Sequence, residues 1–212
     1  ILYCSISGFG QTGPYRDRPG FDIMAQGIGG FLRMTGHPDG KPTKVGIAIN
    51  DIAAGATAIY SILAAELNRR QTGAGQYIDI SLVDAGLAWT VWESGAYFGN
   101  GETPAQTGTR HRRSAPYQAY RTADGYVTIG ANTDRLWLRL INDVLKRPDW
   151  ADDRRFVDLP ARMDHLDELE AEIEAITTTL PTSAWVDRLD SAGVPGGPVL
   201  TYDDTLGDPH VK

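Results

Sequence analysis

Three stretches in the first half of the chain alternate hydrophobic residues with small or polar ones. They cover residues 1–7, 45–49 and 77–82. A hydrophobic period of two is typical of strands, because successive side chains point to opposite faces. We therefore predict a buried strand at the start of the chain, a second strand over 45–49, and a third, half-exposed strand over 77–82.

Hydrophobic residues at intervals of three and four fill the segments between and after these strands, and they predict helices there. The first helix covers 21–36, and the second runs from Ile52 to a glycine stop at Gly73. A third helix over 85–98 follows the last strand, with Asp84 as its N-cap. The order strand, helix, strand, helix indicates an α/β layer with parallel strands.

The second half of the chain has a different pattern. Two strand-like runs on either side of residues 122–125, Thr-Ala-Asp-Gly, predict a β-hairpin. Three helices and a short closing strand are expected after it, over 134–146 with Thr133 as cap, 165–179 with Asp164 as cap, 183–192 between Thr182 and Gly193, and 194–200. This order of elements predicts a small α+β domain.

A long segment rich in Gly, Thr and Pro, residues 99–114, separates the two patterns. Structureless segments of this length are uncommon inside a compact domain, so we interpret it as a linker or a functional loop. The predicted organisation is a first domain over 1–98, this linker or active-site loop, and a second domain over 115–212.

Composition narrows the class of protein. The 212 residues carry a net charge of −7, which does not favour nucleic acid as a partner. The apolar runs are broken well before the length that a membrane span needs, so no membrane association is expected. The single cysteine, Cys4, fits a reducing compartment such as the cytoplasm, and the five tryptophans are expected in the core. The chain begins without Met, directly in a strand-like run, so we expect it to be the middle of a longer protein.

Asp51 is the first candidate for chemistry. It stands between the predicted strand 45–49 and the helix after Ile52, where the simplest interpretation is an N-cap. A carboxylate at this position could also react, because ligands of open α/β sheets bind at the carboxyl ends of the strands. The residues around it are small, and Asp side chains act as covalent nucleophiles in several enzyme classes.

Two basic loops are the other candidates. In RDRPGFD, residues 16–22, Arg16 and Arg18 could contact phosphate, and the alternative is a solvated turn. In TRHRRS, residues 109–114, a solvated surface run is the simpler interpretation. His111 has no Cys, Asp or Glu at ligand spacing, so no metal site is expected. Dinucleotide, Walker and G-x-S-x-G motifs are absent from the sequence.

Three segments in order resemble the class III CoA-transferase family. They are SISGFGQTGPYRDRPGFDIMAQ, then VGIAINDIAAGATAIYSILAAELNRRQTGAGQYIDISLVDA, then APYQAYRTADGYVTIGA, and RPDWADDRRF, the segment around Arg162 and AGVPGGPV continue the resemblance. The family includes formyl-CoA transferases, carnitine-related CoA transferases and α-methylacyl-CoA racemases. The resemblance covers nearly the whole chain, and it is the combination that is specific.

The resemblance implies that Asp51 is the catalytic carboxylate of a CoA transferase. It would take an acyl group from acyl-CoA as a mixed anhydride, then carry CoA as an aspartyl thioester, and pass it to a carboxylic acid. Arg18, Pro19, Gly20 and Phe21 would contact CoA, which is a substrate, and no permanently bound cofactor is implied. A family loop that closes over the reacting group falls near RHRRSAP, where we hypothesise that Arg112 or Arg113 recognises the acid.

One position separates the activities within the family. The racemases pair the aspartate with a histidine in a G-H-D segment, so that two bases handle the α-proton. Its counterpart here is Gly20-Phe21-Asp22, and Phe21 cannot transfer a proton. The sequence therefore favours a transferase over an acyl-CoA racemase or epimerase. A non-catalytic CoA-binding member, in which Asp51 only caps a helix, is the third alternative.

The resemblance also implies the fold. A large Rossmann-like domain with a parallel sheet, present here in part, would be joined to a small α+β domain, and two chains would interlock in a homodimer. The first strands and the returning C-terminal segment of the large domain would lie outside this chain.

Overall fold

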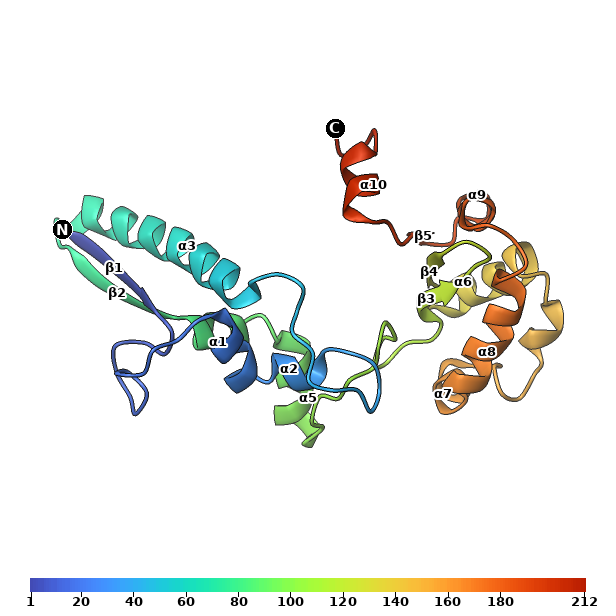
Figure 1. Cartoon of the computed structure of the whole chain (residues 1–212), viewed down its shortest axis with the longest axis horizontal. Coiled ribbons are helices and arrows are strands. Elements are labelled where there is room, and N and C mark those ends of the chain that lie inside the picture. The colour runs from blue at the N-terminus through green and yellow to red at the C-terminus, as the bar shows by residue number, and fades with distance from the viewer. The chain divides into compact units, whose positions relative to one another are not determined.

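The computed structural model describes residues 1–212 and consists of two compact units, Ile1–Gly108 and Thr109–Lys212 (Figure 1). The first combines a parallel strand pair with helices, and the second combines an antiparallel sheet with helices. The chain is therefore a mixed α/β protein, in agreement with the two patterns of the sequence.

The N-terminal unit is built on two parallel strands joined by a long helix. β1 (Leu2–Ser7) pairs in parallel with β2 (Gln76–Ser81), from Leu2 opposite Gln76 to Ser7 opposite Ser81. The connection contains α3 (Ile49–Thr72), which runs alongside both strands (Figure 1). Gly73 ends α3 in the left-handed conformation with φ 74°, which confirms the glycine stop, and the pairing of β1 with β2 confirms the parallel arrangement.

The strand predicted over 45–49 does not form. Residues 45–48 are irregular, and α3 begins at Ile49. The backbone of this segment bonds to a side chain of α1 (Asp22–Ile28): Val45 N–H donates to Gln26 Oε1 at 2.9 Å. The buried Gln26 side chain thus accepts a backbone hydrogen bond that a neighbouring strand would accept in a sheet. The alternation of apolar residues in the sequence does not indicate such a contact.

The helix predicted over 21–36 is broken into α1 and α2 (Phe31–Met34). The break falls at Gly29 and Gly30, and Gly30 has a φ of 82°. A Cβ atom on Gly29 would lie 2.9 Å from the Ala25 carbonyl oxygen, so the close turn between the two helices requires glycine there.

The helix predicted over 85–98 is also two helices, α4 (Leu82–Leu87) and α5 (Val91–Asn100). Ser81 caps α4 by accepting a hydrogen bond from the Asp84 N–H at 3.2 Å. Asp84 was expected to be the cap, and it is instead the third residue of the helix.

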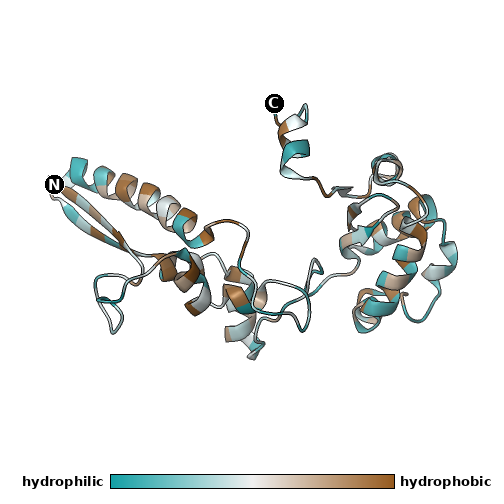
Figure 2. Ribbon diagram, in the orientation of Figure 1, coloured by the Kyte–Doolittle hydropathy of each residue, from teal (hydrophilic) through white to brown (hydrophobic).

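Hydrophobic positions recur along α3 as far as Leu67, and its last turn is polar (Figure 2). Several of them are exposed, namely Ile52, Ile59, Tyr60, Ile62, Leu63 and Leu67. Parallel sheets are normally covered on both faces. The strand pair and α3 therefore carry apolar surface that the N-terminal unit itself leaves uncovered.

The C-terminal unit contains a three-stranded antiparallel sheet in the order β3-β4-β5. Its strands are β3 (Tyr117–Arg121), β4 (Tyr126–Gly130) and β5 (Gly196–Pro198). The turn between β3 and β4 is closed by the Thr122 N–H, which donates to the Gly125 carbonyl, and this confirms the predicted hairpin. The helices are α6 (Asp134–Arg139), the π-helix Leu140–Val144, the 3₁₀-helix Pro148–Ala151, α7 (Leu159–Asp164), α8 (Leu166–Thr177), α9 (Thr182–Ala192) and α10 (Tyr202–Gly207).

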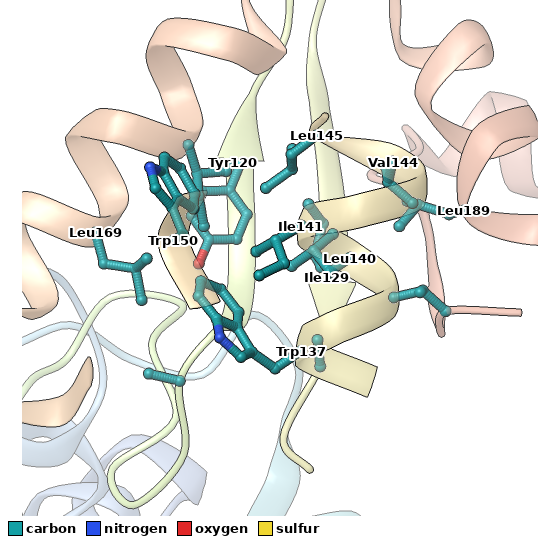
Figure 3. Packing of buried hydrophobic residues seen from close by; sticks show 14 of the residues in the cluster. Tyr120, Ile129, Trp137, Leu140, Ile141, Val144, Leu145, Trp150, Leu169 and Leu189 are labelled. Carbon is teal, nitrogen blue, oxygen red and sulfur yellow. The ribbon is translucent and has the colours of Figure 1, made fainter. Parts of the chain in front are cut away.

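The core of the C-terminal unit packs aliphatic side chains together with large aromatic ones (Figure 3). The rings of Trp137 and Trp150 are stacked with their centroids 6.1 Å apart. Trp185 is also buried, so three of the five tryptophans lie in the core as predicted. Trp89 and Trp92 do not: they are 47% and 75% exposed.

Two of the three predicted helix caps in this unit are wrong. Thr133 caps α6 as expected, by accepting a hydrogen bond from the Leu136 N–H. Asp164 instead ends α7, a helix that the pattern did not predict and that Asp158 caps. Thr182 does not cap α9 with its own side chain, because its N–H and hydroxyl both donate to Asp124 at 2.8 Å. The predicted glycine stop at 193 is confirmed, with a φ of 61°.

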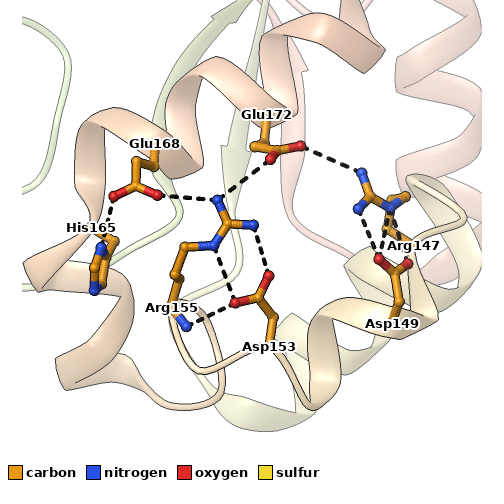
Figure 4. A network of polar contacts seen from close by, with 7 residues as sticks. All are labelled: Arg147, Asp149, Asp153, Arg155, His165, Glu168 and Glu172. Atoms are coloured by element: carbon orange, nitrogen blue, oxygen red, sulfur yellow. Dashed lines mark hydrogen bonds and ion pairs between the residues drawn. The ribbon is translucent and has the colours of Figure 1, made fainter.

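A network of ion pairs ties α8 to the preceding loops of the C-terminal unit (Figure 4). Arg155 contacts Asp153 at 2.8 Å and Glu168 at 3.1 Å, and Glu168 also contacts His165 at 2.9 Å. Hydrogen bonds from Arg155 hold the pKa of the Asp153 carboxyl below its ordinary value. The pKa of Glu168 is lowered by His165 and by Arg155.

Candidate functional site

Asp51 is the third residue of α3. Its side chain is exposed and forms no hydrogen bond or ion pair in this chain. The N-cap position is Ala48, and no side chain of the segment caps the helix. The carboxylate therefore lies beside the first helical turn without capping it, and both of its oxygens are open to a ligand.

The position of Asp51 relative to the strands follows from how α3 is connected. The helix ends beside the start of β1, where the Gln76 N–H donates to the Ile1 carbonyl. Its first turn lies at the other end, where the Asn50 side chain donates to the Leu82 carbonyl just after β2. Asp51 is thus at the carboxyl ends of the parallel strands, where ligands of α/β sheets bind.

The helix face beside Asp51 is bare. A helical side chain covers the turn N-terminal to its own Cα, so the residue at position 55 would cover the surroundings of Asp51. That residue is Gly55, and a Cβ atom built on it would meet no atom within 4 Å. Ala53 and Ala54 face inward and are buried. Gly55 therefore leaves open space on the exposed side of α3 beside the carboxylate, while Ala53 and Ala54 pack the opposite side of the helix closely.

A hydrogen bond between α1 and α3 fixes the first turn of α3. The Asn50 N–H donates to Asp22 Oδ1 at 2.9 Å, and Gln26 Nε2 donates to Asp22 Oδ2 at 2.6 Å. Nothing in the sequence marks this role, because Asp22 has the pattern of an ordinary acidic residue in the first turn of a helix. Asp22 supplies from another helix the acceptor that the N-terminus of α3 lacks in its own sequence.

The Asn50 side chain holds the same turn from its other side. It is fully buried, and its Nδ2 donates to the Leu82 carbonyl at 3.0 Å. Gly86 of α4 lies directly against it: a Cβ atom on Gly86 would be 2.2 Å from Nδ2. The approach of α4 to α3 at this point therefore depends on glycine.

The loop between β1 and α1 is closed where two glycines meet. A Cβ atom on Gly20 would lie 3.0 Å from the Gly8 Cα and 3.1 Å from the Phe9 ring. Phe9 contacts Tyr15 edge to face, with ring centroids 5.7 Å apart. The Arg18 guanidinium lies over the Tyr15 ring, 3.8 Å from its centroid. The loop is thus an ordered unit that ends in a stacked arginine.

The four expected CoA contacts have different surroundings in this loop. Arg18 and Pro19 are exposed, and Phe21 is 72% exposed at the N-cap of α1. Gly20 makes the close approach that closes the loop. A cavity of about 280 Å³ beneath the loop is lined by Asp79 and Asp84 among others and by none of these four residues. Its carboxylates make it unsuited to an anion.

The basic segment 109–114 belongs to the C-terminal unit and is anchored to β3. The His111 N–H donates to the Tyr117 carbonyl at 3.0 Å. Arg110 pairs with Asp167 at 2.7 Å and with Glu170, so it has a structural role. Burial lowers its pKa, but these two carboxylates outweigh that effect and raise the pKa above its ordinary value.

Arg162 holds the end of the same segment from inside the unit. Its side chain is fully buried, with Nε donating to the Ala115 carbonyl at 2.9 Å and Nη1 donating to the Phe156 carbonyl at 3.0 Å. Burial lowers the pKa of this guanidinium. The basic segment therefore leads into β3 from a fixed point, Ala115.

Two chemical features are not found in this structure. No group of three or more His, Cys, Asp or Glu side chains is arranged to hold a metal ion. No helix is both long enough and apolar enough to span a bilayer.

Comparison with known proteins decides the family. The model for CoA-transferase family III matches residues 1–212. The chain belongs to this family. It is 35% identical to a succinate–glutarate CoA-transferase of Agrobacterium fabrum, covering 100% of this chain and 53% of that protein. It is 37% identical to an acetyl-CoA:oxalate CoA-transferase of Acetobacter aceti, covering 99% of this chain and 54% of that protein.

The fold agrees with the family. The crystal structure of a CaiB/BaiF family protein from Brucella suis superposes with a TM-score of 0.87, at 36% identity, over 100% of this chain and 56% of that one. This family III chain spans about half the length of the relatives it matches.

The structure connects the two segments that the family resemblance singles out. Phe21 is followed by Asp22, and Asp51 is preceded by Asn50. The hydrogen bond between Asp22 and Asn50 therefore joins the residues next to Phe21 and next to Asp51. The predicted basic residues of 110–113 lie in the other unit.

Proposed function

We propose that this family III protein is a CoA transferase that moves CoA from an acyl-CoA to a carboxylic acid, with Asp51 as covalent nucleophile. The observation that carries the proposal is the exposed, unpaired Asp51 carboxylate in the first turn of α3, at the carboxyl ends of the parallel strands. The helix dipole favours a carboxylate in the first turn whatever its role, so the family resemblance and the open space beside Gly55 are what support a reactive role for Asp51.

The first half of the reaction transfers the acyl group. An Asp51 oxygen attacks the thioester carbonyl carbon of the donor, and the C–S bond breaks to give a mixed anhydride and CoA thiolate. The thiolate then attacks the Asp51 carbonyl of the anhydride, which releases the first carboxylic acid as its carboxylate. Asp51 now carries CoA as a thioester.

The second half repeats these steps in reverse. The acceptor carboxylate attacks the Asp51 thioester and displaces CoA thiolate, which gives a new anhydride. The thiolate attacks the acceptor carbonyl of that anhydride, which forms the new acyl-CoA and regenerates the Asp51 carboxylate. Only a carboxylate nucleophile forms the anhydride that this sequence requires. The N-terminus of α3 stabilises negative charge on Asp51 and on the oxyanions that form beside it.

Binding of CoA is assigned to the loop before α1. Arg18 supplies a cation for a phosphate group, and its stacking on Tyr15 holds the guanidinium in place before the ligand arrives. Pro19, Gly20 and Phe21 continue the same surface toward Asp22. The bonded pair Asp22 and Asn50 then leads from this loop to Asp51.

The acceptor is proposed to be a small dicarboxylic acid. The relatives' names include glutarate, oxalate, mesaconate and D-citramalate, all of them acids with two carboxylates. One carboxylate would react, and the second needs a cationic partner. Arg112 and Arg113, on the segment anchored to β3, are the residues proposed to supply it.

The decisive experiment is Asp51→Asn in the full-length protein. Activity is measured with succinyl-CoA and acetyl-CoA against this set of dicarboxylates, and the acyl-enzyme is trapped with hydroxylamine. We expect Asp51→Asn to lose at least about 1,000-fold in kcat, because Asn is not a nucleophile, while stability changes little. Asp84→Asn is the matched control, since Asp84 is also the exposed third residue of a helix. Transfer that survives in Asp51→Asn would refute the mechanism.

Two other outcomes would identify the alternatives. Wash-in of deuterium at the α-carbon of an acyl-CoA, without transfer, would indicate a racemase or epimerase, against which Phe21 argues. Binding of CoA without either reaction would indicate a non-catalytic member. We further propose an interlocked homodimer, whose mass light scattering of the full-length protein tests, and a cytoplasmic location, which cell fractionation tests.

A further inference from the structure

We propose that Asp22 is a positioning residue for the reaction at Asp51, acting through the backbone of Asn50. This inference rests on the proposed covalent role of Asp51. Asp22 accepts a hydrogen bond from the Asn50 N–H at 2.9 Å, and the next peptide unit carries the nucleophile. The contact comes from another helix, α1, so it sets where the first turn of α3 lies relative to the loop before α1.

Besides Asp22, the hydrogen bond from Asn50 Nδ2 to the Leu82 carbonyl anchors the first turn of α3, and the turn has no side-chain cap of its own. Ala48 at the N-cap provides no side-chain acceptor. The Ile49 N–H bonds only to the Ile47 carbonyl, two residues earlier, at 2.9 Å. Asp51 itself has no partner. Orphan N–H groups at a helix N-terminus are normally satisfied by a local cap, and here the charged Asp22 oxygen takes that role.

Asp22 is itself held in place from the side opposite Asn50. Its second oxygen accepts from Gln26 Nε2 at 2.6 Å, and Gln26 is fully buried. The Gln26 oxygen accepts from the Val45 N–H at 2.9 Å. Asp22 and Gln26 therefore fix both the segment that enters α3 and the first turn of α3, while Asn50 is anchored to Leu82 behind it.

Two different aspartates thus fix the first turn of α3 and carry out the proposed attack: Asp22 accepts the hydrogen bond, and Asp51 reacts. An aspartate that capped its own helix would have its oxygens occupied by N–H groups, which would weaken it as a nucleophile. With Asp22 as the acceptor, the first turn is fixed and the Asp51 oxygens stay free. Small displacements of a reacting group are costly, with about 100-fold in rate for about 1 Å. Loss of the Asp22 acceptor should therefore appear in the chemical step.

The test uses Asp22→Ala and Asp22→Asn in the full-length protein, with the donor and acid that support Asp51-dependent transfer. We expect Asp22→Ala to lower kcat by about 10- to 100-fold, with KM for acyl-CoA changed by less than about 3-fold. The rate of hydroxylamine-trapped acyl-enzyme formation should fall in parallel. Asp22→Asn keeps an oxygen that can accept from Asn50 but loses the charge and the acceptor for Gln26 Nε2, so it should lower kcat by only about 2- to 5-fold.

Asp158→Ala is the matched control. Asp158 also accepts a hydrogen bond from a helix N–H, that of Ala161 at 2.8 Å, but at α7 of the C-terminal unit. It should lower the melting temperature and leave kcat within about 2-fold of wild type. If Asp22→Ala behaves in the same way, with stability lowered and kcat unchanged, Asp22 is a structural cap and the inference is wrong.

Failure of this inference is distinct from failure of the proposed function. An inactive Asp51→Asn together with a fully active Asp22→Ala would remove only the role of Asp22. If Asp22→Ala does not fold, Asp22→Asn decides alone. A decrease in kcat of about 2- to 5-fold with KM unchanged supports the role, because a neutral acceptor is weaker than a charged one, and an unchanged kcat overturns it.

Discussion

Asp22 accepts a hydrogen bond from the backbone N–H of Asn50 at 2.9 Å, and this contact joins the loop before α1 to the first turn of α3. The proposed CoA-binding residues end at Phe21, and the proposed nucleophile begins the exposed face of α3 at Asp51. The proposed donor-binding loop and the proposed nucleophile are thus linked by a single bonded pair.

Gly86→Ala should destabilise the N-terminal unit. The added Cβ atom would lie 2.2 Å from Asn50 Nδ2 and 2.8 Å from its Cγ, so the buried Asn50 side chain must move. Forcing an extra carbon into a packed site costs about 1–3 kcal/mol, which urea unfolding would detect. Gly95→Ala in α5 is the control, because its Cβ atom meets nothing within 4 Å. It should stabilise the helix by up to about 1 kcal/mol. Equal effects of the two changes would show that Asn50 is not confined by Gly86.

The sequence predicts the features that depend on local patterns, and it does not predict the contacts of the first turn of α3. The stop at Gly73, the parallel pairing of β1 and β2, and the hairpin around residues 122–125 follow from local patterns of glycine and apolar residues, and all three formed. Asp51 is a candidate from its position before the helix, and the resemblance gives it the catalytic role, although the strand expected before it does not form.

Some of the errors share a physical cause. At the strand expected over 45–49 and at the N-termini of α3 and α9, a side chain distant in sequence accepts the hydrogen bond of a backbone N–H group. Gln26 takes the Val45 N–H, Asp22 takes the Asn50 N–H, and Asp124 takes the Thr182 N–H. Such contacts have no periodicity, so no pattern in the sequence marks them. The same limit kept Asp22 out of the predicted site.

Arg18→Ala should weaken binding of the donor without slowing the chemical step. Arg18 is exposed and held on the Tyr15 ring, a geometry that presents a cation to a phosphate group. We expect KM for acyl-CoA to rise about 3- to 10-fold with kcat within about 2-fold, because this contact would be the same in the ground and transition states. The effect should shrink as salt is added. Arg33→Ala, which removes an exposed arginine from α2, is the control. An Arg18→Ala variant with the KM of wild type would exclude Arg18 from the CoA site.

Reversal of charge at Arg112 and Arg113 should weaken binding of the acid. These arginines stand beside His111, which is anchored to β3, and two glutamates would repel a dicarboxylate. We expect KM for the acid to rise at least about 10-fold, while KM for acyl-CoA changes much less. The double variant Arg135→Glu and Arg154→Glu makes the same change in net charge at exposed positions of the same unit. Unchanged affinity for the acid in the Arg112 and Arg113 variant would count against this assignment.

Arg155→Met should lower stability at neutral pH and have little effect in acid. Arg155 contacts Asp153 and Glu168, and both carboxyls have a pKa below the ordinary values of 3.8 and 4.5. A carboxyl with a lowered folded-state pKa contributes stability that is fully present above its unfolded pKa and is lost as the pH falls through the folded value. The melting temperatures of wild type and Arg155→Met should therefore differ at pH 7, and the difference should close below about pH 4.

The control for this pH dependence is Arg154→Met, since Arg154 is exposed and forms no ion pair in this unit. Its melting temperature should follow that of wild type throughout the titration. A gap between wild type and Arg155→Met that stays constant from pH 7 to pH 3 would mean that Arg155 stabilises the unit through its packing on Phe156, where the guanidinium lies 4.6 Å from the ring centroid. Such a result would mean that Arg155 stabilises the unit by packing its side chain and not by the ion pairs drawn in Figure 4.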